Sequence, residues 1–174
     1  GVSHTQFREL FNDTWLLEQL TSLAREEITT YGEAYGGKCQ GMSDIYGTEL
    51  RFIVFDIKID GMWLCVPDMD QLASNLGFEV VSWVKISTDI KELNAQHDAP
   101  SVQAARNGCG EDKPREGIVI RAPIEVIKNN ENRIIAKHKQ ESFSERATPQ
   151  KVVDPAKLEI LAEADAISQE WVTE

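Results

Sequence analysis

Residues 49–64 read ELRFIVFDIKIDGMWL, and this stretch decides the fold. The run 52–57 is aromatic and β-branched apart from one aspartate, which is typical of a β-strand. Apolar residues occupy both alternating positions of the run, so we expect both faces of this strand to be covered. Asp60 and Gly61 favour a two-residue hairpin turn, which predicts a second strand at 62–64.

Strand and helix patterns are mixed without strict alternation along the rest of the chain. This mixture, with hairpins, predicts an α+β domain that has mostly antiparallel β-sheets and flanking helices. Alternation and helical spacing place strands at 27–35, 78–86, 117–121 and 133–139, and helices at 14–26, at 68–76 (capped by Asp68 with Gln71), as two short pieces within 88–107 broken at Pro100, and from Asp154 onward.

Length and charge narrow the classes of protein. The chain has 174 residues, which is enough for one good core and too short for two ordinary domains. No apolar run approaches the roughly 18 residues that span a bilayer, so we expect no membrane partner. A net charge of −11 argues against a protein that coats DNA. Residues 113–146 are nevertheless locally basic, which indicates a focused anion site.

The three cysteines, Cys39, Cys65 and Cys109, are widely spaced and form no CxxC pair. An odd number with this spacing is typical of neither a disulfide framework nor a zinc site. No basic and apolar leader pattern opens the sequence. We therefore expect a reducing, cytoplasmic location.

Polar residues in four segments are candidates for chemistry. Glu33 lies between glycines, Asp56 lies inside the apolar strand, Glu116 precedes a buried-type strand, and Lys137 and Lys139 share one face of another strand. Taken singly, each has a plain structural explanation: a solvated turn, a hydrogen-bonded aspartate, charged strand ends or an edge strand protected by lysines. Together, carboxylates for a divalent metal and lysines for phosphate oxygens indicate phosphoryl or nucleotidyl transfer.

Four motifs stand in an order that resembles a known superfamily. YGEAYGG (31–37), FIVFDI (52–57), EGIVI (116–120) and IIAKHKQESFSE (134–145) resemble motifs III, IIIa, IV and V of the covalent nucleotidyltransferases, which include polynucleotide ligases and RNA capping enzymes. The Lys-x-Lys followed by Ser-Phe-Ser-Glu is most similar to the ATP-dependent RNA ligases of the second phage type. The resemblance covers about residues 28–145 and implies the nucleotidyltransferase (ligase adenylation domain) type of α+β fold, with AMP bound between sheets.

By position in these motifs, the resemblance implies a set of ATP- and AMP-binding residues. Glu33 would contact the ribose, and Phe55 would stack on the adenine, a role that suits an aromatic ring. Gln40 matches a polar residue that follows motif III. Lys137 and Lys139 would hold the α-phosphate.

The same resemblance implies the catalytic residues and the metal. Lys137 and Lys139 would stabilise the charge of the α-phosphate in the transition state, and Asp56 matches an acidic residue that the family needs. Glu116 would help to bind Mg²⁺ or Mn²⁺. In this family a lysine attacks the α-phosphate of ATP, AMP passes to a 5′-phosphate on RNA, and a 3′-hydroxyl then displaces AMP. The implied partners are RNA ends or a nicked duplex.

The sequence departs from the family pattern at its nucleophile. In the family, the attacking lysine lies in a KxDG motif upstream of motif III, and residues 1–27 contain no lysine. We therefore expect a catalytic-domain fragment: residues 1–150 as an adenylation domain without motif I, inactive in self-adenylylation, and residues 151–174 as a helix that begins a helical domain. Residues 58–61 spell KIDG but follow motifs III and IIIa, so a hairpin turn explains them.

Two other functions stay open from the sequence. A non-catalytic nucleotide- or RNA-binding module on the same fold would also carry these pocket residues, and an upstream KxDG would distinguish the ligase from it. A DNA ligase or capping-type core is a third reading. The Ser-Phe-Ser-Glu tail argues against that third reading, and end-joining assays on RNA and DNA nicks would decide.

Overall fold

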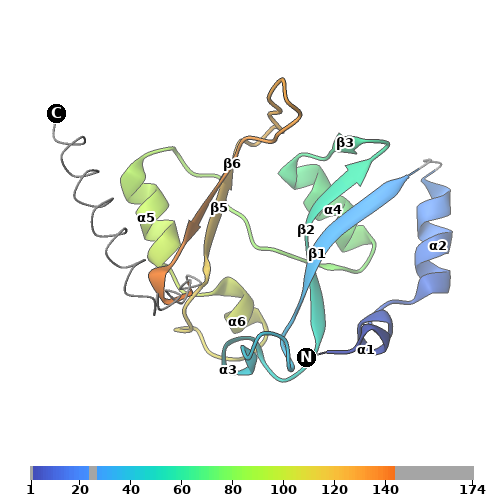
Figure 1. Cartoon of the computed structure of the whole chain (residues 1–174), viewed down its shortest axis with the longest axis horizontal. Coiled ribbons are helices and arrows are strands. Elements are labelled where there is room, and N and C mark those ends of the chain that lie inside the picture. Colours follow the sequence, from blue (N-terminus) through green and yellow to red (C-terminus); the bar gives the residue numbers. More distant parts are fainter. Residues whose placement is uncertain (1, 24–26, 144–174) are drawn as a thin grey trace, which may run out of the picture. The chain divides into compact units, whose positions relative to one another are not determined.

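The computed structural model of the chain describes residues 2–23 and 27–143 (Figure 1). The chain divides into two compact units, Gly1–Phe143 and Ser144–Glu174, and the described residues all belong to the first. The helix expected from Asp154 lies outside the described residues. The division at residue 150 into an adenylation domain and a terminal helix stays a prediction.

The described part of the chain is a mixed α+β structure with two β-sheets, which confirms the expected fold class. In the first sheet, β1 and β3 pair antiparallel with β2, and β4 pairs parallel with β2. In the second sheet, β5 and β6 pair antiparallel. The strands are β1 (Ile28–Tyr35), β2 (Arg51–Ile59), β3 (Met62–Trp63), β4 (Glu79–Val80), β5 (Gly117–Arg121) and β6 (Ile135–Lys139).

The helices follow the predicted order with two additions. Two short helices, α1 and α3, were not expected, because elements of four or five residues are too short to show a helical period. The helices are α1 (His4–Arg8), α2 (Asp13–Ser22), α3 (Ser43–Tyr46), α4 (Val66–Asn75), α5 (Ile90–Asp98) and α6 (Val102–Arg106), with a 3₁₀ turn at Glu141–Phe143. The break between α5 and α6 at Pro100 is confirmed.

The predicted start of α4 was wrong. The expected cap was Asp68 with Gln71, but the helix begins after Cys65. Pro67 lies in the first turn, where its missing N–H costs no helical hydrogen bond and its fixed φ suits the helix. The proline was therefore a better signal of the helix start than the acidic residue that follows it.

A β-bulge explains why apolar residues occupy both alternating positions of β2. The register shifts between Tyr31 and Gly32 of β1, and Phe55 of β2 is left without a partner. Because of this extra residue, Val54 and Ile57 enter the same core although they are three residues apart, and both are 0 % exposed. The expectation that both faces of the strand are covered is confirmed, since buried residues flank the bulge on both faces.

The core of the first sheet lies between β2 and α4, with β4 at its side. It is built from fully or almost fully buried side chains: Val54, Ile57, Met69, Ala73 and Val80. Met69 and Ala73 are four residues apart on α4, so one stripe of that helix faces the strand. This arrangement places β2 at the centre of the described structure, with the bulge on its far face.

The hairpin between β2 and β3 confirms the predicted turn. Lys58 pairs with Trp63 and Ile59 with Met62, which leaves a two-residue loop of Asp60 and Gly61. Both loop residues have positive φ (47° and 83°), as a type I′ turn requires. The KIDG letters are therefore the end of a strand and its turn.

The strand expected at 78–86 is mostly absent, which corrects the prediction. Only Glu79 and Val80 pair with β2, and the last ladder contact is the Val81 N–H donating to the Val54 carbonyl at 3.0 Å. Beyond that point, the backbone of residues 82–86 forms no hydrogen bond with any described residue, and their side chains are exposed. β-branched residues favour a strand only where a neighbouring strand is present to pair with them.

Two expectations about the environment of the chain can be compared with the structure. No helix in the described ranges has the length and apolar character to cross a bilayer. All three cysteines are free thiols, as the spacing predicted.

Candidate functional site

The second sheet presents the two candidate lysines on one face. In the β5–β6 ladder, Lys137 pairs with Val119 and Lys139 with Gly117, and alternation puts Arg121 on the same face. The opposite face lies against α5. There the ring of His138 stacks on the ring of His97, with 3.8 Å between the ring centroids. The predicted placement of the lysines on one face, with His138 on the other, is confirmed.

The lysine face is directed toward the bulge of β2. Arg121 shares that face, and its Nη1 donates to Asp56 Oδ1 at 2.5 Å while its Nη2 reaches the Phe55 carbonyl at 3.4 Å. Both apolar residues at this place are accessible: Phe55 is 41 % exposed and Val119 is 60 % exposed. Arg121 thus links the second sheet to the backbone of Phe55. We use the name inter-sheet face for Phe55, Val119 and Lys137.

The two lysines differ in their partners. Lys139 Nζ lies 2.9 Å from Glu116 Oε1, so this cation and the predicted metal ligand form an ion pair. Lys137 is exposed and forms no ion pair within the described ranges of the chain. Its charge is therefore available to an anion.

The two neighbours of Glu116 in the sequence fix its position at the start of β5. The preceding Arg115 donates to the Gln96 carbonyl at 2.7 Å and to the Pro100 carbonyl at 2.9 Å, and burial lowers the pKa of this guanidinium. The following Gly117 approaches β6 so closely that a Cβ there would lie 2.3 Å from the His138 carbonyl oxygen. Glycine is required at this point of the EGIVI motif for that reason.

Glu33 and Gln40 lie together, as their shared assignment to nucleotide binding requires. Glu33 is exposed near the end of β1, and Gln40 Nε2 donates to its Oε1 at 3.2 Å. Gln40 has a φ of 51°, which is uncommon for a residue other than glycine. The loop after β1 thus turns the amide back toward the carboxylate.

Tyr46, which the sequence analysis did not single out, lies within electrostatic range of both Glu33 and Glu116. Burial raises the pKa of the Tyr46 hydroxyl, and the negative charges of Glu116 and Glu33 raise it further. Two carboxylates that are 83 positions apart in the chain therefore act on one hydroxyl. A tyrosine in a glycine-flanked loop shows no pattern that could have revealed this role.

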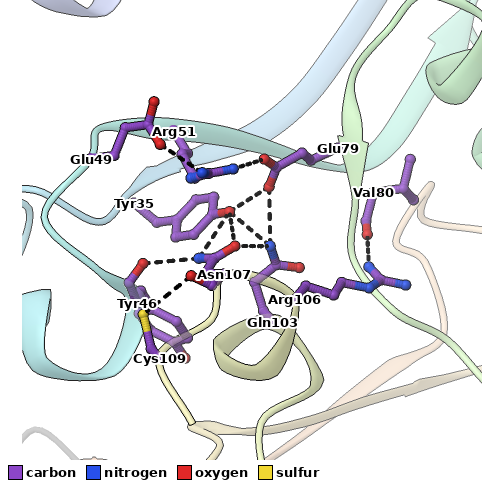
Figure 2. A network of polar contacts seen from close by, with 10 residues as sticks. All are labelled: Tyr35, Tyr46, Glu49, Arg51, Glu79, Val80, Gln103, Arg106, Asn107 and Cys109. Carbon is purple, nitrogen blue, oxygen red and sulfur yellow. Dashed lines mark hydrogen bonds and ion pairs between the residues drawn. The ribbon is translucent and has the colours of Figure 1, made fainter.

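A polar network fixes Tyr46 against the first sheet (Figure 2). Asn107 Nδ2 donates to the Tyr46 carbonyl at 2.9 Å, and Gln103 Nε2 donates to the Tyr35 hydroxyl at 2.8 Å. The Tyr35 hydroxyl in turn donates to Glu79. Burial, aided by this contact, raises the pKa of Tyr35 to about 12. The network joins α6 to β1 and β4 and so supports α3, which ends at Tyr46.

Asp56 lies in an ion cluster on the far side of the bulge. Its side chain is 9 % exposed and accepts hydrogen bonds from Arg121 and Arg133. Arg133 also binds Glu125. Arg133 and Glu125 were not candidates from the sequence. Their contact crosses a turn, and sequence spacing does not predict which residues face each other across a turn of unknown register. The catalytic role of Asp56 stays a prediction.

Two hollows among the described residues contain none of the seven candidate residues. One of about 350 Å³ is lined by Asp70, Ser74 and Trp83 among others. The other, of about 310 Å³, lies beside Glu79 and Gln103.

The donor chemistry for a divalent metal was tested on the described residues. In residues 2–23 and 27–143, no three His, Cys, Asp or Glu side chains come together as a metal site. Mg²⁺ is commonly held by one or two carboxylates together with substrate phosphates. Glu116, whose side chain is 44 % exposed and is paired with Lys139, fits that smaller donor set.

Comparison with known proteins gives the family. The family model described as RNA ligase matches residues 3–139, so the match begins 28 positions before the first motif segment, YGEAYGG (31–37), and ends at Lys139. A search of curated proteins finds no match. The matched range includes all seven candidate residues and most of the chain, and on this ground the chain belongs to the RNA ligase family.

Proposed function

We propose that this chain binds ATP, and its AMP moiety, on the inter-sheet face, and that in its complete form it seals RNA 3′-hydroxyl and 5′-phosphate ends through an adenylylated intermediate. The proposal depends most on one observation: Arg121, on the lysine face of β5, contacts Asp56 and the carbonyl of Phe55. That contact links β5, the strand paired with the lysine-bearing β6, to the backbone of Phe55, whose ring suits adenine.

Each candidate has a role that its surroundings allow. The exposed Phe55 ring is free to stack on a base. Glu33, with Gln40 beside it, offers a carboxylate to ribose hydroxyls. Lys137, which forms no ion pair with any described residue, offers its charge to phosphate oxygens, and this charge would stabilise the α-phosphate as negative charge builds on it.

Glu116 would hold Mg²⁺ or Mn²⁺, which would neutralise phosphate charge when bound. Lys139 forms an ion pair with this carboxylate. A metal at Glu116 would compete with Lys139 for the carboxylate and would add its own positive charge beside the phosphates. Nucleotide affinity should therefore rise with Mg²⁺ more than simple charge screening would give.

The chain itself provides no lysine that matches the family nucleophile. Residues 1–27 contain none, and Lys58 lies at the end of β2, with its Nζ 5.5 Å from the Trp63 ring centroid. We therefore expect binding without self-adenylylation from this chain alone. A second candidate function is a non-catalytic nucleotide- or RNA-binding module on the same fold, which would carry the same pocket residues.

Two measurements on the full chain test the proposal. Isothermal titration should show AMP and ATP–Mg²⁺ binding that Lys137→Ala weakens about tenfold, while Lys91→Ala, an exposed lysine on α5, leaves it unchanged. The absence of nucleotide binding by the wild-type chain, or equal loss in both variants, would contradict the site.

Intact-mass spectrometry after incubation with ATP and Mg²⁺ tests the second point. We expect no added AMP. A mass increase of one AMP that disappears in Lys58→Ala would overturn the assignment of KIDG to a turn. RNA-nick sealing on addition of a separate KxDG-containing segment would favour the ligase over the binding module, and nucleotide or RNA binding without sealing would favour the module.

A further inference from the structure

Four charged side chains join β2 to the chain segment of the second sheet through contacts that exclude most solvent. Asp56 Oδ1 accepts from Arg121 Nη1 at 2.5 Å and from Arg133 Nη2 at 3.1 Å, and its Oδ2 accepts from Arg133 Nη1 at 2.7 Å. Both arginines come from the region of β5 and β6, and the aspartate comes from β2. One carboxylate thus connects the two sheets through three hydrogen bonds.

The second carboxylate of the cluster fixes Arg133 further. Arg133 Nε donates to Glu125 Oε1 at 2.6 Å, and its Nη2 donates to Glu125 Oε2 at 2.8 Å. The same guanidinium lies over the Trp63 ring, with its carbon 4.0 Å from the ring centroid. Hydrogen bonds to Glu125 and Asp56 raise the pKa of Arg133, so it stays charged. A planar guanidinium held on two edges and one face has little freedom to move.

Stability alone does not explain why buried ion pairs join the two sheets. All four side chains are between 9 % and 14 % exposed, and the charges of the two arginines balance those of the two carboxylates. Buried ion pairs lose much of their attraction to desolvation, and apolar residues of similar volume often stabilise as well or better. What directional ion pairs provide, and apolar contacts do not, is a fixed register between elements.

The register that this cluster fixes is the one on which the proposed site depends. Asp56 is the neighbour of Phe55 in the bulge, and Arg121 shares a face with Lys137, which pairs opposite Val119. Val119 is two positions from Arg121, a displacement of about 7 Å along β5. Lys137, opposite Val119, therefore lies at a distance from the bulge that a nucleotide can span. None of the cluster's hydrogen-bonding atoms needs to touch a ligand for this effect.

We infer that Asp56, Arg121, Arg133 and Glu125 form a positioning clamp that sets the spacing between the Phe55 ring and the Lys137 ammonium. The inference rests on the proposed function for its ligand. Asp56 then acts through Phe55 and Arg121 and is a positioning residue. Arg133 and Glu125 become determinants of affinity for a ligand that carries both a base and a phosphate.

The test compares ligands that use one side of the site or both. AMP needs the ring and the lysine together, whereas adenosine needs only the ring. Arg133→Lys removes the hydrogen bonds that the guanidinium donates to both Asp56 and Glu125 at once. We expect it to weaken AMP binding at least tenfold while adenosine binding changes less than twofold. Glu125→Gln is a milder second variant with the same direction. Glu49→Gln, which removes the charge from the exposed ion pair with Arg51, should change neither.

Equal weakening of AMP and adenosine, or no weakening of AMP, in a folded Arg133→Lys variant would overturn the clamp. A wild-type chain that binds neither ligand would overturn the proposed site and leave the clamp to be tested separately by hydrogen exchange. In that measurement, Arg133→Lys should speed exchange of the β5 and β6 amides and leave those of β1 and β2 unchanged. Unchanged exchange throughout, or uniform acceleration, would refute the inference.

Discussion

The two sheets of this chain are held in place by different forces. The first sheet is packed against α4 by apolar side chains, of which Val54 and Ile57 are completely buried. No strand residue of β5 or β6 is buried to that degree, and Val119 is 60 % exposed. Charged contacts through Asp56 and the anchoring of Arg115 hold the second sheet.

The difference separates stability from function in the molecule. Apolar burial is strong but tolerates small displacements, whereas hydrogen-bonded ions fix direction and distance. We conclude that damage to the core should unfold the described unit as a whole, and that damage to the second sheet should first change the geometry of the inter-sheet face. The predictions below test this division, beginning with the largest effect.

Ile57→Ala should have the largest effect on stability. Ile57 is 0 % exposed in the centre of the core, and truncating such a residue costs about 3 kcal/mol in the free energy of unfolding. Urea denaturation followed by tryptophan fluorescence measures it. Ile57→Val, the matched control, should cost about 1 kcal/mol. A loss below that value for the alanine variant would contradict the placement of the core.

Gly117→Ala should have a smaller and more local effect. A Cβ at this position would lie 2.3 Å from the His138 carbonyl, so β5 and β6 must separate. Overpacking of this kind costs about 1–3 kcal/mol. Hydrogen exchange should show faster exchange of the amides in the β5–β6 ladder, while the amides of β1 and β2 keep their protection. Val119→Ala on the same strand should change little, and protection lost equally in both sheets would break the comparison.

Tyr35 should give the smallest effect, and only at high pH. Its pKa is raised to about 12, above the ordinary value of 10.0, so between these pH values the unfolded chain loses a proton that the folded chain keeps. This contribution to stability is therefore complete below pH 10 and is lost as the pH rises toward 12. Tyr35→Phe should show a shallower loss of unfolding free energy between pH 10 and pH 12.

Part of the loss of unfolding free energy at high pH should remain in Tyr35→Phe, because burial raises the pKa of Tyr46 as well. Tyr31→Phe provides the control, since Tyr31 is 37 % exposed and contacts the Trp63 ring and not the Glu79 network. An identical pH profile for wild type and Tyr35→Phe would show that the hydroxyl contributes nothing to folding.

Local patterns predicted the elements well where the chemistry is local. The Asp60–Gly61 turn, the break at Pro100 and the parity of Lys137 and His138 each follow from backbone rules that need no partner. The strand at 78–86 failed because pairing depends on a neighbour that the sequence pattern does not identify. The same limit applies to Arg133 and Glu125, whose contact with each other spans a turn of unknown register.

The site shows the same division. Motif order singled out Glu33, Gln40, Glu116 and Lys139, and the structure shows contacts that the motifs did not predict, from Gln40 to Glu33 and from Lys139 to Glu116. Tyr46 could not be found, since its importance comes from two carboxylates that only the tertiary structure brings near it. The β-bulge at Phe55 was also invisible, because an apolar run on both faces does not distinguish a bulge from a fully covered strand.

The most direct test of the account is an NMR titration of the isotopically labelled full chain with AMP. We predict that the amide shifts change in one connected group that includes Glu33, Phe55, Glu116 and Lys137. The hollow beside Trp83 and Arg106 should stay unchanged. Shifts centred on that hollow, or scattered without involving the inter-sheet face, would contradict the convergence of these residues on one nucleotide.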